Sequence, residues 1–421
     1  SEGTAAKPIP NTQYPIPNIQ YPIPNTQYPG GNVMSSTDHT HDQIIGSIVG
    51  LAVGDALGAP VEGWSAREIS RRFGTLRDYV DTGRLPGAYT DDAQQALCIV
   101  DVLLERGQFD PDALGRKFVE LAQPIAPPTP QSWGEFSGGV RGRYFGAFRG
   151  TGPGFRDSVR ALQRSVSWRE SGTLSAGNGT AMRVGPLGAF YHAGRFVEFR
   201  STIFKSAWIT HTDPRALAGA FMIAYSVVHA INQGDQFRPD RYLRELYTAA
   251  QDAEKAIQRR YWHPDLGVDR ETCHHVSDAV RRIGGWLRRD TNDAIQAISS
   301  YAQRRTSLPT HALSSFILGS GIMAVYLFAR YFEDLEEALV IAINLGGDAD
   351  SIGAMVGAMA GALHGYSALP ARWREGLRKH DAIYARAEAL ARGEGMPAGT
   401  PSLREMEVAL TVEEASRQGK T

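Results

Sequence analysis

Cysteine and an excess of one charge are both nearly absent from this sequence. Its 421 residues include two cysteines, Cys98 and Cys273, too few for the disulfide framework of a small secreted protein. A reduced, cytoplasmic protein is the simpler expectation. Lys and Arg total 44 against 45 for Asp and Glu, so the formal net charge is −1. No overall field would draw the chain to nucleic acid, and an anionic ligand would have to be held by local groups.

A long hydrophobic run is also missing. The most continuous late apolar stretch, residues 352–363, is about half the length that spans a bilayer. The first residues are rich in Pro, Asn, Gln and Tyr, where a secretory signal would be apolar. We therefore expect no membrane association.

Residues 1–33 differ in composition from the rest of the chain. A unit containing Pro-Asn and Gln-Tyr-Pro recurs there, and such dense proline favours extended backbone without a packed core. We interpret residues 1–40 as a tag followed by a disordered Pro-rich linker, and residues 41–398 as one folded domain. Residues 399–421 form a polar C-terminal tail with room for one peripheral helix. Residues 124–155, rich in Pro, Gly and aromatics, are predicted to form a long packed loop.

Helical periodicity dominates from Gln43 onward. Apolar residues fall at helical spacing in 44–51 and 93–104, and residues 214–231 resemble a buried helix with Pro214 in its first turn. Further helices are predicted at 240–260, 272–289, 291–304 and 312–331. Few segments alternate with the period of a strand, so the predicted fold class is all-α.

Two acidic clusters, each directly before a predicted helix, carry the strongest chemical signal. They are residues 90–92 (Thr-Asp-Asp) and residues 346–351 (Gly-Gly-Asp-Ala-Asp-Ser). Helix capping explains either cluster alone, because such side chains accept hydrogen bonds from first-turn amides. One cap needs one oxygen, however, and these two helix starts carry four aspartates. Adjacent carboxylates repel each other, and two hard divalent cations about 3.5–4 Å apart could share such oxygen ligands.

Two further segments add to the metal and anion signals. Residues 54–62 contain two acidic residues, Asp55 and Glu62. We interpret Asp55 as a structural carboxylate that holds helix ends, and Glu62 as a third acidic contribution to the metal site. Residues 177–183 (Gly-Asn-Gly-Thr-Ala-Met-Arg) combine small residues, which let backbone amides approach a phosphate, with polar and cationic side chains. An isolated glycine-rich loop is weak evidence, and this one lacks the strand of a dinucleotide-binding fingerprint.

The order of these motifs along residues 42–370 resembles the ADP-ribosylglycohydrolases, a family that includes the enzyme reactivating dinitrogenase reductase. The motifs are residues 54–62, 90–92, 177–183, 210–214 (Thr-His-Thr-Asp-Pro) and 347–351. The final Thr often seen in the family is Ser351 here, which still offers a hydroxyl ligand. The resemblance implies a compact orthogonal helical bundle with a binuclear metal cleft, holding two Mg²⁺ ions, with Mn²⁺ as the alternative.

Residue by residue, the resemblance implies three roles. The metal ligands would be Thr90, Asp91, Asp92, Asp348, Asp350 and Ser351. Asp91, Asp92 or Glu62 would act as the catalytic base, and Glu62 matches a position that in some members contacts the metal and gates substrate entry. ADP-ribose would be contacted by Gly177, Asn178, Gly179, Thr180, Met182, Arg183 and His211. Taken alone, a single histidine such as His211 is more often structural.

The implied reaction is hydrolysis of the bond between ADP-ribose and a protein side chain. The glycosidic carbon can pass through an oxocarbenium-like transition state, and a metal pair could orient ribose hydroxyls and lower the pKa of a water. Because a guanidinium can depart already charged, N-glycosidic ADP-ribosylarginine is the expected linkage. The expected partners are an ADP-ribosylated protein as substrate and ADP-ribose as product, with the chain acting as a monomer.

Three alternatives remain open. The same fold could act on O-linked ADP-ribose, such as that on serine, or on free ADP-ribose derivatives. The same carboxylates could serve a two-metal phosphohydrolase that cuts the diphosphate and yields AMP. The chain could also be a binding or immunity protein that blocks a toxin, although a pure binder needs no such acidic set.

Overall fold

The computed structural model describes residues 36–125 and 144–418, and helices make up most of that part. Its strands are β1 (Tyr144–Phe145) and β2 (Phe148–Arg149), which pair antiparallel with Tyr144 opposite Arg149. The predicted all-α class is confirmed. The repeat in residues 1–33 lies outside the described residues, as do residues 126–143 of the predicted loop.

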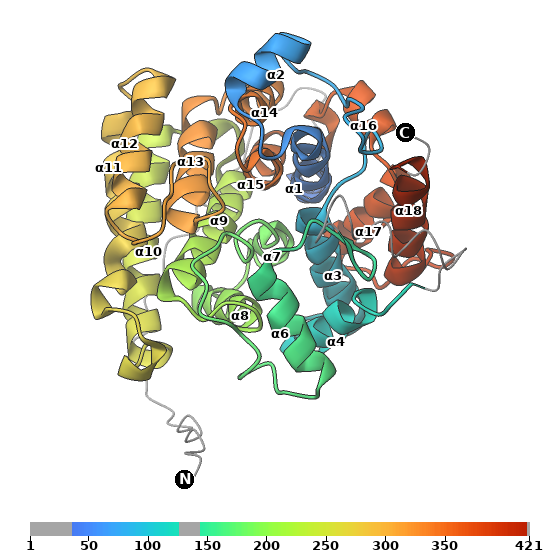
Figure 1. The fold of residues 1–421 in the computed structure, drawn as a ribbon, viewed down its shortest axis with the longest axis horizontal. Coiled ribbons are helices and arrows are strands. Elements are labelled where there is room, and N and C mark those ends of the chain that lie inside the picture. Colours follow the sequence, from blue (N-terminus) through green and yellow to red (C-terminus); the bar gives the residue numbers. More distant parts are fainter. Residues whose placement is uncertain (1–35, 126–143, 419–421) are drawn as a thin grey trace. The chain divides into compact units, whose positions relative to one another are not determined.

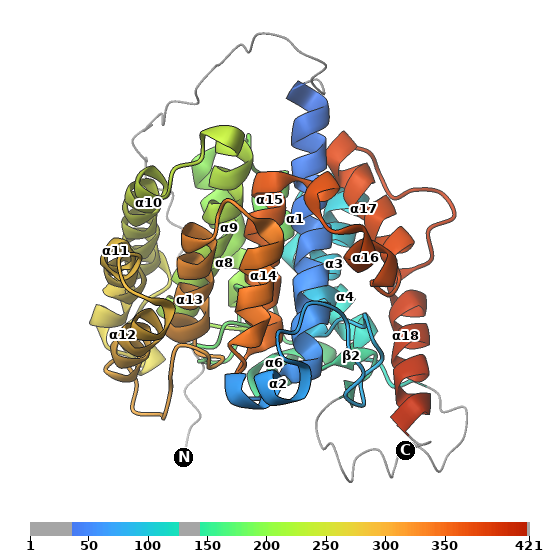
Figure 2. The same cartoon turned by 90° about the horizontal axis from the view of Figure 1, so that it is seen from above.

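The helices α1 (Ser36–Gly58) and α15 (Ala349–His364) lie side by side and antiparallel (Figures 1 and 2). They touch backbone to backbone: a Cβ added at Gly54 would lie 2.0 Å from the Gly353 carbonyl oxygen. A Cβ at Gly357 would lie 2.0 Å from the carbonyl oxygen of Gly50. Only glycine allows this approach, which brings the end of α1 to the start of α15.

The other helices surround this pair (Figure 2). Packed next to α15 are α7 (Gly185–Phe190), α9 (Pro214–Gln233), α13 (Ile317–Arg330) and α14 (Leu335–Asn344). Beyond them lie α8 (Phe196–Trp208), α10 (Pro239–Arg260), α11 (His275–Trp286) and α12 (Thr291–Gln303). The region around α1 includes α3 (Asp91–Arg106), α4 (Pro111–Leu121), α17 (His380–Arg392) and α18 (Leu403–Gln418). Shorter elements are α2 (Ala66–Phe73), α6 (Pro153–Gln163), α16 (Ala371–Gly376) and the 3₁₀ turns η1 (Ala59–Val61), η2 (Gly234–Gln236), η3 (Pro264–Leu266), η4 (Arg270–His274) and η5 (Tyr366–Ala368).

Local capping explains several helix ends. The carboxylate of Asp213 accepts a hydrogen bond from the Arg215 amide at the start of α9. The α13 helix begins five residues later than predicted, at Ile317, because the preceding residues pair with the glycine-rich loop: the Ile317 amide donates to the carbonyl of Ala176. This contact holds the loop against the start of α13.

Two helical segments, Thr37–Val61 and Pro214–Gln236, are long and apolar enough to cross a membrane by length and composition. Of their most apolar windows, 100% and 83% are buried inside the protein, as expected for core helices. The helix predicted in the polar tail is α18, and it is less peripheral than predicted. It buries Leu403, Met406 and Leu410 in the hydrophobic core.

Candidate active site

The start of α3 is capped by a side chain from α1. Among the described residues, the N-cap residue Thr90 makes no side-chain capping bond of its own. The carboxylate of Asp55 accepts hydrogen bonds from the Thr90 amide at 2.8 Å and from the Ala93 amide at 2.9 Å. The Thr90 hydroxyl donates to it at 2.8 Å. Asp55 therefore has the predicted structural role. Because Asp55 caps α3, the carboxylates of Asp91 and Asp92 are not needed for capping.

The start of α15 follows a turn made by two glycines with positive φ, Gly346 at +72° and Gly347 at +66°. The carboxylate of Asp348 makes no capping bond to α15 within the described part of the chain, and it accepts instead from the Asn178 side-chain amide at 2.5 Å. Asp350 accepts from the adjacent Ser351 amide at 2.9 Å. Helix capping therefore accounts for neither acidic cluster.

Five aspartates gather where α1, α3 and α15 meet: Asp55, Asp91, Asp92 and Asp350 are buried, and Asp348 is half-buried. Burial is the largest cause that raises their pKa values, to about 6 for Asp55, about 7 for Asp348 and about 8 for Asp91. Burial also raises the pKa values of Asp92 and Asp350 well above the usual range. Neighbouring carboxylates add to the effect, since the Asp55 charge raises the pKa values of both Asp91 and Asp92. A cation would relieve this repulsion.

The donor set fits a hard divalent cation. Within residues 36–125 and 144–418, Oδ1 of Asp92 is buried without a hydrogen-bond partner, a costly state for a carboxylate oxygen. Its Oδ2 lies 3.2 Å from the Thr90 hydroxyl oxygen, which makes its shorter hydrogen bond, at 2.8 Å, to Asp55. No three acidic, histidine or cysteine side chains of the described residues already form a complete metal cage. The carboxylates would therefore have to turn toward a bound cation.

The glycine-rich loop lies against the second acidic cluster. Besides its bond to Asp348, the Asn178 side-chain amide donates to the hydroxyl of Ser320 at 2.9 Å. The Thr180 hydroxyl donates to the Ala216 carbonyl at 3.0 Å. The Ser351 hydroxyl donates to the Met182 sulfur at 3.8 Å. The structure thus brings the loop and the predicted metal ligands together.

Arg183 is linked to Asp91 through the side chain of Gln95. It is fully buried, and it donates to the Gln95 side-chain oxygen at 2.6 Å and to the Thr210 hydroxyl at 2.9 Å. The amide of Gln95 in turn donates to Asp91 at 2.6 Å. Burial lowers the pKa of Arg183 to about 9. Its contact with ADP-ribose stays a prediction.

His211 stands beside the same loop. A Cβ added at Gly179 would lie 3.0 Å from Cε1 of the imidazole, and Nδ1 hydrogen-bonds with the Thr210 hydroxyl at 2.9 Å. Burial and the nearby Arg183 charge lower the pKa of His211 to about 3. The ring is therefore neutral at physiological pH and suited to hydrogen bonding rather than to donating a proton as an acid.

Glu62 follows η1 and faces the aspartates. Its charge raises the pKa values of Asp91, Asp348 and Asp350. The Glu62 carboxylate accepts from Nη2 of Arg84 at 3.1 Å, and its side chain is 40% exposed. Glu62 thus contacts solvent and also lies close enough to the buried aspartates to influence their charge.

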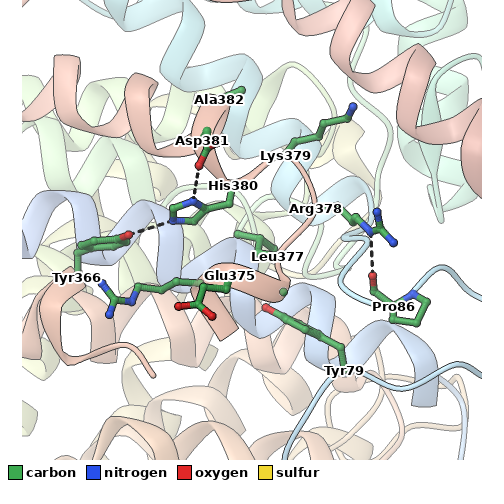
Figure 3. A pocket seen from close by; sticks show the side chains of 12 residues that line it. Tyr79, Pro86, Tyr366, Glu375, Leu377, Arg378, Lys379, His380, Asp381 and Ala382 are labelled. Atoms are coloured by element: carbon green, nitrogen blue, oxygen red, sulfur yellow. Dashed lines mark hydrogen bonds and ion pairs between the residues drawn. The ribbon is translucent and has the colours of Figure 1, made fainter. Parts of the chain in front are cut away.

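A separate cavity of about 1040 Å³ lies beside α16 and α17 (Figure 3). Its wall mixes cationic and acidic groups, including Arg374, Glu375 and Lys379. His380 is already engaged there by the Tyr366 hydroxyl and by Asp381 (Figure 3). None of its lining residues belongs to the aspartate group, so it is distinct from the candidate active site.

Residues 36–399 match the family model described as ADP-ribosylglycohydrolase. The chain belongs to the ADP-ribosylglycohydrolase family. It is 25% identical over 359 residues to the ADP-ribosyl-[dinitrogen reductase] glycohydrolase of Rhodospirillum rubrum, a match that covers 82% of this chain and 97% of that protein. It is 26% identical over 339 residues to the ADP-ribosylarginine hydrolase Tri1 of Pseudomonas putida, which covers 79% of this chain and 74% of that protein.

A solved structure of an ADP-ribosylglycohydrolase-related protein complex has a TM-score of 0.56 and 27% identity. The match covers 84% of this chain and 98% of the chain in the solved structure. As an ADP-ribosylglycohydrolase, the chain belongs to an enzyme family that acts on ADP-ribosylated substrates. Members of the family generally use divalent metal ions.

Sequence reasoning missed two supporting groups in this glycohydrolase. Gln95, which orients Asp91, lies four residues after it on α3, so helical spacing offered a signal. The buried Arg149 holds the start of α3 by donating to the Tyr89 carbonyl at 3.0 Å, and it pairs with Glu407 at 2.8 Å. Arg149 and Glu407 are 258 positions apart, so no local sequence pattern predicts their contact.

Proposed function

We propose that this chain is a Mg²⁺-dependent hydrolase that releases ADP-ribose from modified arginine side chains through a two-metal site. The observation that carries the proposal is the cluster of four largely buried carboxylates that helix capping does not explain, those of Asp91, Asp92, Asp348 and Asp350. Oδ1 of Asp92, which lacks a hydrogen-bond partner among the described residues, marks where a cation would be most favourable.

Six residues would hold the ions: Thr90, Asp91, Asp92, Asp348, Asp350 and Ser351. When bound, the ions would supply a nucleophilic water of lowered pKa and an anchor for the ribose hydroxyls. Asp91 and Asp92 are the leading candidates for the base that accepts the proton of the water, with Glu62 third. The hydrogen bond from Gln95 fixes the orientation of the Asp91 carboxylate.

Substrate contacts would come from the loop that faces the aspartates. Gly179 has no side chain, so the neutral ring of His211 packs directly against the loop backbone, and a ribose or diphosphate group bound on the loop would lie close to this ring. Asn178 ties the loop to Asp348, and it would couple substrate contact to the metal ligands.

The arginine linkage has one support in the comparisons and one in chemistry. One relative, of which the match covers 74%, is named an ADP-ribosylarginine hydrolase. A guanidinium leaving group can depart protonated, and the neutral His211, whose pKa is about 3, would not be available as a strong acid. A serine leaving group would need a proton donor.

The test incubates the enzyme with Mg²⁺ and with matched arginine- and serine-ADP-ribosylated peptides, followed by chromatographic analysis of the products. We expect intact ADP-ribose from the arginine peptide and little from the serine peptide. The reverse preference would identify an O-linkage hydrolase, and AMP would identify a phosphohydrolase. A tight complex without turnover that survives Asp91→Ala and Asp350→Ala would identify a binding protein.

A further inference from the structure

The carboxylate of Glu62 is held by the guanidinium of Arg84, which lies in the chain segment before α3. Nη2 of Arg84 donates to Glu62 at 3.1 Å, and the Arg84 side chain is only 7% exposed. Glu62 would otherwise face the negative charges of Asp91 and Asp348, whose pKa values it raises. Arg84 therefore compensates a carboxylate that borders a strongly acidic site.

A second carboxylate lies near Arg84, and unlike that of Glu62 it is buried. Glu414 is 1% exposed, and its Oε1 lies 3.9 Å from Nη1 of Arg84. Across residues 36–125 and 144–418, neither carboxylate oxygen of Glu414 has a hydrogen-bond partner. Its Oε2 lies 3.9 Å from Nε of Arg149, again beyond hydrogen-bond reach. A buried carboxylate without hydrogen bonds would gain stability if Arg84 moved toward it.

The helix that carries Glu414 is firmly anchored. Almost two turns earlier on α18, Glu407 accepts from the Tyr89 hydroxyl at 2.6 Å and from the Gln94 amide at 2.7 Å. Arg149 pairs with Glu407 at 2.8 Å. The α18 helix begins at Leu403, beyond residue 399 where the family match ends. It is thus a fixed platform next to Arg84.

We propose that Arg84 and Glu414 form a latch that positions Glu62, with Arg84 exchanging between the two glutamates. A cation entering the aspartate group attracts Glu62 and competes with Arg84 for its carboxylate. Arg84 is too buried to be left unpaired, so it transfers to Glu414 as Glu62 turns toward the site. Arg84 and Glu414 are positioning residues, and the inference rests on the proposed metal-dependent function.

The latch predicts a specific pattern of Mg²⁺ affinity. Glu414→Gln removes the alternative acceptor, so Arg84 stays on Glu62, and Mg²⁺ binding weakens by about tenfold. Arg84→Gln releases Glu62, so Mg²⁺ binding is as strong as in the wild type or stronger. In the Arg84→Gln background, Glu414→Gln then has no further effect. Simple loss of a negative charge near the site would instead weaken binding equally in both backgrounds.

The experiment is a double-mutant cycle measured by titration calorimetry with Mg²⁺ alone, on the full chain. Glu413→Gln is the matched control, because Glu413 is the neighbouring residue on α18, is 45% exposed and pairs with Arg378. We expect its Mg²⁺ affinity to equal that of the wild type. If Glu414→Gln does not fold, Arg84→Gln alone carries the test, because a purely structural role of Arg84 would weaken Mg²⁺ binding.

Four results overturn the latch. Equal affinities for Glu414→Gln and wild type, or equal losses in both backgrounds, would refute the exchange while leaving the proposed metal site intact. Weaker binding by Arg84→Gln would refute it as well. Wild-type protein that binds no Mg²⁺ and releases no ADP-ribose would overturn both the latch and the proposed function, a pattern distinct from the first three results.

Discussion

The spacing between α1 and α15 sets the geometry of the aspartate group, and Gly357→Ala tests this dependence. A Cβ at this position would lie 2.0 Å from the carbonyl oxygen of Gly50, whereas ordinary van der Waals contact begins at 3.4 Å. The two helices would have to move apart locally by about 1.4 Å, the difference between these distances. No flexible side chain can absorb the shift, because the opposing atom belongs to the backbone.

The size of the effect follows from two opposing contributions. Overpacking against backbone costs about 3 kcal/mol, and the higher helix propensity of alanine returns about 1 kcal/mol. Gly357→Ala should therefore lower the free energy of unfolding by about 2 kcal/mol. It should also weaken Mg²⁺ binding, although Gly357 lies almost two helical turns from Asp350.

The assay is urea unfolding with EDTA, combined with Mg²⁺ titration. Gly285→Ala on α11 is the matched control, since a Cβ there meets no atom of the described residues within 4 Å. This control should gain about 0.5–1 kcal/mol of stability and keep its Mg²⁺ affinity. A Gly357→Ala protein with wild-type stability and Mg²⁺ affinity would refute the dependence of the site on helix spacing.

Three other perturbations have defined outcomes. Because the folded-state pKa values of Asp55, Asp348 and Asp91 are raised from 3.8 to about 6, 7 and 8, metal-free protein should lose stability as pH rises from about 4 to 8. Saturating Mg²⁺ should offset that loss increasingly with pH, and parallel melting curves with EDTA and with Mg²⁺ would contradict this. Burial raises the pKa of Glu254 to about 7, so Glu254→Gln should gain stability over wild type as pH rises from 5 to 8 in urea unfolding, and a pH-independent difference would count against it. Arg183→Met should cost about 3 kcal/mol in urea unfolding and weaken Mg²⁺ binding, because Gln95 loses its partner; unchanged Mg²⁺ affinity would exclude this support of Asp91.

The helices are largely predictable from sequence because their ends leave local signals. The predicted segment 291–304 matches α12 (Thr291–Gln303), where Asp290 caps the first turn by accepting from the Asp293 amide. The predicted segment 272–289 is too long at its start, because residues Arg270–His274 form the 3₁₀ turn η4 before α11. Periodicity alone does not distinguish the two kinds of helix there.

The candidate site is only partly predictable. Its excess of aspartates is visible in the sequence, since two helix starts carry more acid than capping can use. The direction of the Arg183 side chain is not visible, because a loop residue can point to a ligand or into the core. The contacts of Arg149 with Glu407 on α18 join distant segments and leave no periodic pattern, so only the folded structure reveals them.

The most direct test of the central claim compares wild type, Asp350→Asn and the control Asp265→Asn for Mg²⁺ binding and for ADP-ribose release from an arginine-modified protein. Asp265 is 96% exposed and lies outside the aspartate group. We expect wild type and control to bind Mg²⁺ and to release ADP-ribose until EDTA is added, whereas folded Asp350→Asn loses both properties. Release that persists in EDTA, or in Asp350→Asn, would contradict the claim that the buried aspartates form the metal site.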